Sequence, residues 1–212
     1  MTERPGAGRW VPEGATLDEL RTAAQGCRGC ELYQDATQAV VGEGPTDARL
    51  MVLGEQPGDQ EDRAGEPFVG PAGKLLDRAL DQAGIDPASV FRTNVVKHFR
   101  FAGTRGKQRI HKSPGRVHVA ACGPWLVAEM AVVRPHGVVL LGGTAGKALY
   151  GSSFRVGESR GQLLDWPEAL PVAQRPAWVL PTAHPSAVLR SREREADLEA
   201  FVADLEMAAQ AL

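Results

Sequence analysis

Acidic residues are absent from a long central part of the sequence. Between Asp86 and Glu129 there is no aspartate or glutamate, although the chain of 212 residues contains 26 of them. The same part holds eight basic residues: Arg92, Lys97, Arg100, Arg105, Lys107, Arg109, Lys112 and Arg116. Because the net charge of the whole chain is −2, the rest of the chain must carry −10. Charges spread only for solubility would be mixed, so this segregation indicates a surface that binds a polyanion.

Cysteine is scarce and long apolar runs are missing. The three cysteines are Cys27, Cys30 and Cys122, and their odd number argues against a disulfide framework, which leaves metal ligation or free thiols. No apolar run approaches the roughly 20 residues that a membrane-spanning helix needs. Residues 1–14 also lack the apolar core of a signal peptide. We therefore expect a cytoplasmic protein that does not interact with membranes.

The pattern of apolar residues predicts a single α/β domain. We expect residues 1–15, which contain several glycines and prolines, to form a flexible tail, and residues 16–212 to form one domain. Strands are predicted at residues 49–54, 90–97, 137–143 and 177–180. Helices are predicted at residues 16–26, 72–83, 113–133 and 192–212, with a short helix that ends at Tyr150. Strands that alternate with helices predict a parallel sheet with helices on both faces.

The loops after the first, second and fourth predicted strands form the expected ligand-binding region, since parallel sheets bind ligands at the carboxyl ends of their strands. These loops cover residues 55–70, 97–111 and 182–186. The second loop contains His111 in a basic segment that follows Gly106. Asn94 ends a buried strand, where its amide needs a partner in the protein or in a ligand. Phe68 and His184 lie in the other two loops, and each is ambiguous by itself.

A possible metal site is spread along the sequence. Its four donors are Cys27 and Cys30, Cys122 inside a predicted helix, and His98 just after a predicted strand. Three thiolates and one imidazole could hold zinc tetrahedrally or ligate one corner each of an iron–sulfur cluster. Three structural thiols and a surface histidine are the alternative, and the spacing alone leaves the three interpretations open.

A glycine-rich segment at residues 142–147 has some likeness to a phosphate-binding loop. Its spacing is one residue short, and Ala148 stands where a hydroxyl group would have to reach magnesium. A simple turn from a strand into a helix explains the segment better.

Five segments taken together resemble the uracil-DNA glycosylase superfamily, and specifically its iron–sulfur branch. They are Gly54-Glu55-Gln56-Pro57-Gly58, Pro67-Phe68-Val69-Gly70-Pro71-Ala72-Gly73, Asn94-Val95-Val96-Lys97, Ala121-Cys122-Gly123-Pro124-Trp125 and His184-Pro185-Ser186. The resemblance extends from Cys27 to the last predicted helix. It implies a three-layer α/β/α sandwich around a four-stranded parallel sheet, a 4Fe–4S cluster and uracil-containing DNA as the substrate.

Two positions resemble a narrower subgroup known as UdgX. His98 stands where most iron–sulfur glycosylases have cysteine, and residues 107–111 match the basic insert Lys-Arg-Arg-Ile-His at four of five positions, with Gln108 as the departure. UdgX proteins bind uracil-containing DNA and become covalently joined to it through the histidine of the insert. The resemblance therefore implies His111 as the nucleophile. It also implies a set of cluster ligands: Cys27, Cys30, His98 and Cys122.

The resemblance also assigns roles in a single-turnover reaction. Phe68 would stack on uracil, Asn94 would pair with its edge, and His184 would donate to the departing base. Glu55 would orient His111 and accept its proton. The remaining expected site residues are Gln56 and Asp59 as shapers of the pocket, and Gly54, Lys107, Arg109 and Ser186 as further contacts with substrate or DNA.

Three alternatives remain open at this point. The protein could release uracil repeatedly with water as the nucleophile, act as a noncatalytic iron–sulfur sensor of nucleic acid, or be a structural module built around zinc. We expect the protein to be a monomer. We also expect it to prefer single-stranded DNA, because extruding a base from a duplex costs a few kcal/mol.

Overall fold

The computed structural model describes residues 4–168 and 170–212 and confirms the predicted four-stranded parallel sheet. The strands are β1 (Leu50–Gly54), β2 (Val90–Asn94), β5 (Gly137–Leu141) and β6 (Trp178–Thr182), in the spatial order β2-β1-β5-β6. In register, Leu50 pairs with Val90 on one side and with Gly137 on the other. All four strands point the same way, so their carboxyl ends share one edge of the sheet.

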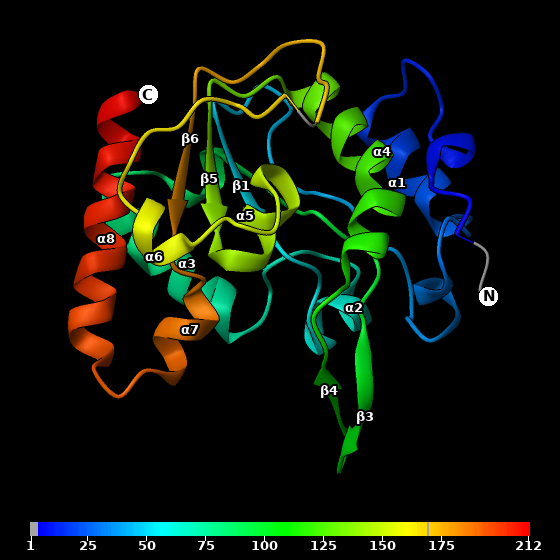
Figure 1. Cartoon of the computed structure of the whole chain (residues 1–212), viewed down its shortest axis with the longest axis horizontal. Helices are drawn as coiled ribbons and strands as arrows, with labels where there is room; N and C mark the ends of the chain where they lie inside the picture. The colour runs from blue at the N-terminus through cyan, green and yellow to red at the C-terminus, as the bar shows by residue number, and fades with distance from the viewer. Residues whose placement is uncertain (1–3, 169) are drawn as a thin grey trace.

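Helices cover both faces of this sheet, as Figure 1 shows. One face packs against α1 (Leu17–Gln25), α4 (Arg116–Val133) and α5 (Gly142–Tyr150), and the other packs against α3 (Pro71–Gln82), α7 (Pro185–Arg190) and α8 (Arg194–Ala211). Alternate residues of one strand enter different cores, because successive side chains point to opposite faces. Thus Met51 and Leu53 lie in the first core, whereas Leu50 and Val52 lie in the second. The expected three-layer α/β/α arrangement is confirmed.

Shorter elements complete the fold: α2 (Asp59–Ala64), α6 (Val156–Ser159), and the 3-10 helices η1 (Gly8–Trp10), η2 (Glu31–Gln34) and η3 (Pro87–Ser89). The glycine-rich segment after β5 leads directly into α5, which confirms the strand-to-helix turn. The segment expected to be a flexible tail makes defined contacts from residue 4 onward. Within it, Ala7 is buried and its N–H donates to the Ala121 carbonyl at 2.7 Å.

Several predicted boundaries were wrong. Helix α4 begins at Arg116, three residues later than expected, because His118 Nδ1 accepts the Gly115 N–H at 2.8 Å and so caps the helix there. Strand β2 ends at Asn94 rather than at residue 97. The Val95 and Val96 N–H groups still bond to the Gly54 and Glu55 carbonyl oxygens, but the chain then leaves the sheet, because the Lys97 N–H donates to Cys122 Sγ. Helix α2 was expected to be loop.

The largest error concerns the basic loop, which forms a β-hairpin. Strands β3 (Phe101–Arg105) and β4 (Gln108–His111) pair in antiparallel register and extend away from the body of the molecule (Figure 1). Arg105 pairs with Gln108, so only two residues form the turn, and Gly106 supplies the left-handed backbone with φ of 62° that such tight turns need.

Helix α4 has the length and apolar composition of a membrane span when judged without its surroundings. In the fold it is a core helix, with Trp125 and Leu126 buried against the sheet. Glu129 on the same helix is fully buried and paired with Lys97.

Candidate active site

Three of the expected residues meet at the carboxyl edge of the sheet. Gly54 ends β1, Asn94 ends β2, and the two are partners in register. His184 follows β6 closely, and β6 ends at the same edge because the sheet is parallel. The loop and helix that follow β1 add Glu55, whose side chain is considered below.

Gly54 forms the floor of a small polar and aromatic nest. A Cβ atom at this position would lie 2.4 Å from Asn94 Oδ1 and 2.9 Å from Phe68 Cζ. Both distances are shorter than van der Waals contact, so no larger residue fits here without moving its neighbours. The Asn94 amide and the Phe68 ring therefore both lie against the Gly54 backbone, and we call these three residues the nest.

Phe68 has a left-handed backbone, with φ of 59°, which is rare for a residue with a side chain. Such a conformation costs on the order of 1 kcal/mol and persists only when the surroundings impose it. Helix α3 imposes it here, because a Cβ at Gly73 in its first turn would lie 1.5 Å from the Phe68 carbonyl oxygen. The backbone strain at Phe68 is thus held in place by a close helix contact.

The side-chain amide of Asn94 is available to a ligand. Asn94 is only 3% exposed, yet within residues 4–168 and 170–212 its side-chain amide has no hydrogen-bond partner; its backbone carbonyl accepts from Lys97 Nζ. Buried amides are almost always hydrogen-bonded. An unpaired one beside an aromatic ring suits a planar ligand that offers both a donor and an acceptor at its edge.

His184 is held as a neutral donor. Its Nδ1 accepts the Ser186 N–H at 3.1 Å and lies 2.8 Å from Ser186 Oγ. Because Nδ1 accepts, the ring proton is on Nε2. Burial, together with the charges of Arg190 and His111, lowers the pKa of His184 to about 4. At neutral pH the residue therefore offers an uncharged Nε2–H, and Ser186 acts by orienting it.

The side chains of His111 and Glu55 face one another, and Glu55 directly follows Gly54 of the nest. His111 Nε2 lies 3.7 Å from Glu55 Oε1, and the His111 side chain is 48% exposed. Glu55 Oε1 is buried and has no hydrogen-bond partner among the described residues. The two groups are farther apart than a hydrogen bond, but catalytic hydrogen bonds often tighten only when substrate binds.

Gln56 anchors the base of the hairpin. Its Nε2 donates to the Arg100 carbonyl at 3.1 Å and to the Lys112 carbonyl at 3.2 Å, and its Oε1 accepts the Arg100 N–H at 3.1 Å. Arg100 precedes β3 and Lys112 follows β4. One amide thus holds both ends of the hairpin, so Gln56 positions the segment that carries His111.

Arg109 ties the hairpin to α2 rather than pointing to solvent. Its Nε bonds Asp59 Oδ1, and its Nη2 lies 2.8 Å from Asp62 Oδ2. Burial alone would raise the pKa of Asp59, but its bonds to Arg109 hold that pKa below the ordinary value. The guanidinium also lies 5.2 and 5.1 Å from the ring centroids of Phe99 and Phe101. Arg109 and Asp59 were expected at the substrate, but they bind each other and fix the hairpin to α2. We call Arg109 and the side chains that it contacts the clamp; they are Asp59, Asp62, Phe99 and Phe101.

The rest of the hairpin is exposed. Its exposed cations are Arg105, Lys107 and, just beyond β4, Lys112. Ile110 is 48% exposed and alternates with Arg109 and His111 along β4, so it lies on the opposite face. The hairpin therefore turns Arg109 and His111 toward the body and leaves its remaining cations accessible.

The expected metal donors are buried. Cys27 follows α1, Cys30 precedes η2, Cys122 lies in α4 and His98 follows the end of β2. Within residues 4–168 and 170–212, no three His, Cys, Asp or Glu side chains converge closely enough for a single metal ion.

The surroundings of these donors favour metal ligation in another form. Cys27 Sγ accepts from Trp125 Nε1 at 3.3 Å, and Cys122 Sγ accepts the Lys97 N–H at 3.2 Å. Burial lowers the pKa of His98 to about 4, so the imidazole is neutral, as a ligand must be; burial also raises the pKa of Cys122 to about 12, so its thiol would have to lose a proton when a metal binds.

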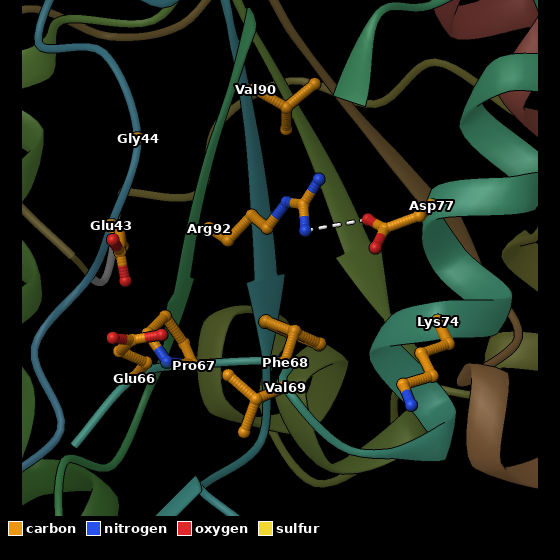
Figure 2. Close-up of a pocket in the computed structure, with 10 residues that line it drawn as sticks. All are labelled: Glu43, Gly44, Glu66, Pro67, Phe68, Val69, Lys74, Asp77, Val90 and Arg92. Carbon is orange, nitrogen blue, oxygen red and sulfur yellow. Dashed lines mark ion pairs between the residues drawn. The ribbon is translucent and has the colours of Figure 1, made fainter. Parts of the chain in front are cut away.

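A cavity of about 450 Å³ lies beside the edge strand β2 (Figure 2). Phe68 lines one end of it, while Arg92 points across it to Asp77, with 2.7 Å between the charged groups. Neither Gly54 nor Asn94 lines this cavity. It is therefore a hollow beside the sheet edge that shares only Phe68 with the nest.

Two residues of the clamp escaped the sequence analysis. Asp62 is fully buried and accepts the Thr37 N–H at 3.0 Å in addition to binding Arg109. Phe99 stacks on Phe101 at 5.5 Å and lies 6.1 Å from the His111 ring. The sequence held one signal for Phe99, the pair of aromatic residues at positions 99 and 101 just after His98.

Comparisons with known proteins show the family to which the chain belongs. Residues 41–206 match the family described as the uracil DNA glycosylase superfamily. The type-4 uracil-DNA glycosylase of Thermotoga maritima is 36% identical over 170 residues, which cover 80% of this chain and 81% of that protein. That of Pyrobaculum aerophilum is 35% identical over 174 residues, covering 82% and 85%. Because the family match covers most of the chain and includes every element at the carboxyl edge of the sheet, the chain belongs to the uracil DNA glycosylase superfamily.

Proposed function

We propose that this protein excises uracil from DNA and that His111 then bonds covalently to C1′ of the sugar, as in the UdgX subgroup. The excision activity is supported by the family match and by the type-4 uracil-DNA glycosylases among its relatives. The single observation that carries the covalent step is the position of His111, on an anchored hairpin at the mouth of the site and opposite a buried, unpaired Glu55 oxygen.

The nest would recognise the base. An extruded uracil would stack on Phe68 and pair its edge with the Asn94 amide, which has no partner of its own in the described structure. The Gly54 backbone limits how deeply the base can enter, because even one added carbon would strike both neighbours. These contacts account for binding and orientation of the base.

His184 would stabilise the leaving group. When the bond between C1′ and N1 of uracil breaks, its electron pair remains on the base, whose oxygens gain negative charge. A preorganised donor aimed at developing charge contributes about 10²- to 10³-fold to the rate. The Nε2–H of neutral His184 suits this role, since Ser186 fixes the tautomer.

His111 would capture the resulting sugar cation. A lone pair of the imidazole forms the new bond to C1′, and the proton of the ring passes to Glu55, which is the nearest carboxylate. An aligned group can have an effective concentration of about 10⁵ M or more, which exceeds that of water. The reaction then ends after one turnover, with the protein attached to the abasic sugar.

The basic part of the hairpin would bind the DNA backbone. Arg105, Lys107 and Lys112 are exposed, whereas Arg109 is engaged by Asp59 and Asp62. We therefore assign Arg109, Asp59 and Gln56 to positioning His111, and the exposed lysines and arginine to phosphate contacts. We further propose that the protein acts as a cytoplasmic monomer and prefers single strands, consistent with a site formed within one chain.

A 4Fe–4S cluster fits the donors Cys27, Cys30, His98 and Cys122. Each ligand of a cluster binds a different iron, so the donors need not converge on one point as they would around zinc. N–H groups directed at two of the sulfurs and a neutral imidazole suit such a ligand set. When bound, the cluster would hold α1, α4 and the segment after β2 together.

A denaturing gel tests the covalent step. The native protein mixed with uracil-containing single-stranded DNA should give a band of higher mass that survives denaturation, and one equivalent of uracil. His111→Ser should lose the band, whereas His136→Ser, an exposed histidine just before β5, should keep it. Cross-linking by His111→Ser would show that another residue is the nucleophile.

Turnover with water is the second candidate. It is favoured by the exposure of His111 and by the 3.7 Å gap to Glu55, which leave room for water beside the sugar. Release of several equivalents of uracil per protein molecule, without the shifted band, would support it in place of covalent capture.

A further inference from the structure

Residues 94–98 connect the two sites proposed above, although they form no regular helix or strand beyond Asn94. The first residue of this segment belongs to the nest, and the last is a proposed cluster ligand. Between them, the N–H groups of Val95 and Val96 donate to the Gly54 and Glu55 carbonyl oxygens, each at 3.0 Å. The segment is therefore bound to the same stretch of chain that forms the floor of the nest.

Lys97, in this segment, is fully buried and contacts both sites. Its Nζ donates to Asn94 O at 2.6 Å, to Thr93 Oγ1 at 2.7 Å and to Glu129 Oε2 at 2.7 Å. These three bonds use all the hydrogens of the ammonium group. Its backbone N–H donates to Cys122 Sγ at 3.2 Å. One residue thus holds the carbonyl of the base-reading residue and the sulfur of a proposed ligand.

The partner carboxylate is equally buried. Glu129 Oε1 accepts the Gly42 N–H at 2.8 Å, and its Oε2 accepts from Thr93 Oγ1 at 2.8 Å as well as from Lys97. Glu129 and Cys122 lie two turns apart on the same face of α4. A buried ion pair is seldom the most stable filling of a core, because apolar residues of similar volume often do as well. Stability alone therefore does not account for it.

We propose that Lys97 is a positioning residue that couples the cluster site to the uracil site. A cluster that fixes Cys122 and His98 would hold Lys97, and Lys97 would hold the Asn94 backbone in the orientation that reads uracil. Coupling between two sites is reciprocal, so a base bound at Asn94 must also retain the cluster. The inference rests on the proposed function, because it needs both the base site and the cluster.

The test measures how a bound base changes the rate of cluster loss. Visible absorbance of the purified holoprotein would be followed after addition of an iron chelator, with a single-stranded oligonucleotide that carries 2′-fluoro-2′-deoxyuridine. The fluorine slows base loss, so the site stays occupied without reaction. The same oligonucleotide with thymidine controls for general shielding by DNA. We expect the uracil analogue to slow cluster loss by about fivefold or more relative to thymidine, as is typical of coupled sites.

The deciding variant is Lys97→Met combined with Glu129→Gln. It removes both charges at similar volume, leaves the backbone bond from residue 97 to Cys122, and retains groups that can pair with Gly42 and Thr93. The protection should fall below about twofold, near the lower limit of measurable coupling. Asp204→Asn is the matched control, since Asp204 is also a buried carboxylate, bonded to Arg160 at 2.8 Å and to Thr182 at 2.6 Å in β6, the edge strand farthest from β2. It should keep the protection.

The outcomes separate this inference from the proposed function. The coupling alone is overturned if the native protein excises uracil and holds its cluster, but the uracil analogue does not slow loss of that cluster. It is also overturned if the analogue slows cluster loss in the double variant as much as in the native protein. Active protein without iron overturns the cluster and the coupling together. If the double variant does not fold, the native protein still decides, because removal of its cluster must then weaken binding of the uracil analogue relative to the thymidine control; unchanged binding overturns the coupling.

Discussion

The nest and the hairpin are built in different ways. The nest lies at the ends of buried strands, where contacts are so close that a single added carbon at Gly54 would collide with two neighbours. The hairpin extends from the body and is held chiefly by polar groups, with Gln56 at its base and Arg109 along its side. The proposed recognition of the base thus belongs to the core of the fold, whereas the proposed capture of the sugar belongs to an attached part. The difference implies that capture can be lost while excision is kept.

A side chain added at Gly54 should have the largest effect, and that effect should be on the rate of excision. Gly54→Ala places a methyl group against Asn94 Oδ1 and Phe68 Cζ, so uracil can no longer enter in the orientation that reacts. We expect the single-turnover rate of excision to fall by about 10²-fold or more, since small displacements in an active site have effects of this size. Gly157→Ala is the control, because a Cβ there meets no atom within 4 Å. An active Gly54→Ala protein would contradict the nest as the base site.

Acid should lower the stability of the folded protein through His184. Its pKa is lowered to about 4, chiefly by burial, whereas an unfolded histidine titrates near 6.5. Between these values only the unfolded state takes up the proton, so stability falls as the pH drops from about 6.5 toward 4. At pH 5 this contribution amounts to about 2 kcal/mol.

Denaturant unfolding of the native protein and of His184→Gln would measure that contribution. The difference in unfolding free energy between the two should be constant above pH 7 and should shrink toward pH 5. A difference that does not change with pH would show that His184 is not held in its neutral form.

Releasing the hairpin should separate capture from excision. Arg109→Met removes the bonds to Asp59 and Asp62, so His111 is no longer held opposite Glu55. We expect the ratio of covalent adduct to free uracil to fall by about tenfold, the result of losing roughly 1.4 kcal/mol of positioning energy, with excision changed far less. Arg105→Met is the control, because it removes an exposed charge from the same hairpin. An unchanged ratio in Arg109→Met would mean that the clamp does not position His111.

A substitution at the tip of the hairpin should have the smallest effect, and that effect should be on DNA binding. Lys107→Ala removes one exposed cation, so binding to single-stranded DNA should weaken a few-fold and depend less on salt, by about 0.7 in the logarithmic slope. Binding measured between 50 and 200 mM salt would give that slope. Lys147→Ala, in the last turn of α5, should leave it unchanged.

The core of the fold was predictable from the sequence because its strands are continuous apolar runs. The strand at residues 137–141 is apolar throughout and buried on both faces, which is typical of a parallel sheet. The hairpin lacked such a signal, because β3 and β4 are almost entirely exposed and are held by Gln56 and Arg109. Contacts of that kind depend on residues more than forty positions away.

The candidate site residues were predictable as a group only through resemblance to a family, since Phe68, Asn94 and His184 each had an ordinary structural explanation. What the sequence did not indicate was the division of labour among polar residues. Arg109 and Asp59 were expected at the substrate, and their bond to each other became evident only in three dimensions. Likewise, α2 was missed because the one residue that it buries is a carboxylate, Asp62, rather than an apolar side chain.

The buried carboxylate of Asp62 favours two positions of the hairpin, docked or fully released. Asp62 has no exposed surface, and its charge is balanced by the Arg109 guanidinium when the hairpin is docked. If the hairpin swung away, the same charge would remain in the interior without its partner, at a cost of several kcal/mol until water reached it. Partly open positions are therefore disfavoured, and the hairpin should be either closed or fully released. The proposed capture of a short-lived sugar cation would need this property, because the hairpin would have to be closed before the cation forms.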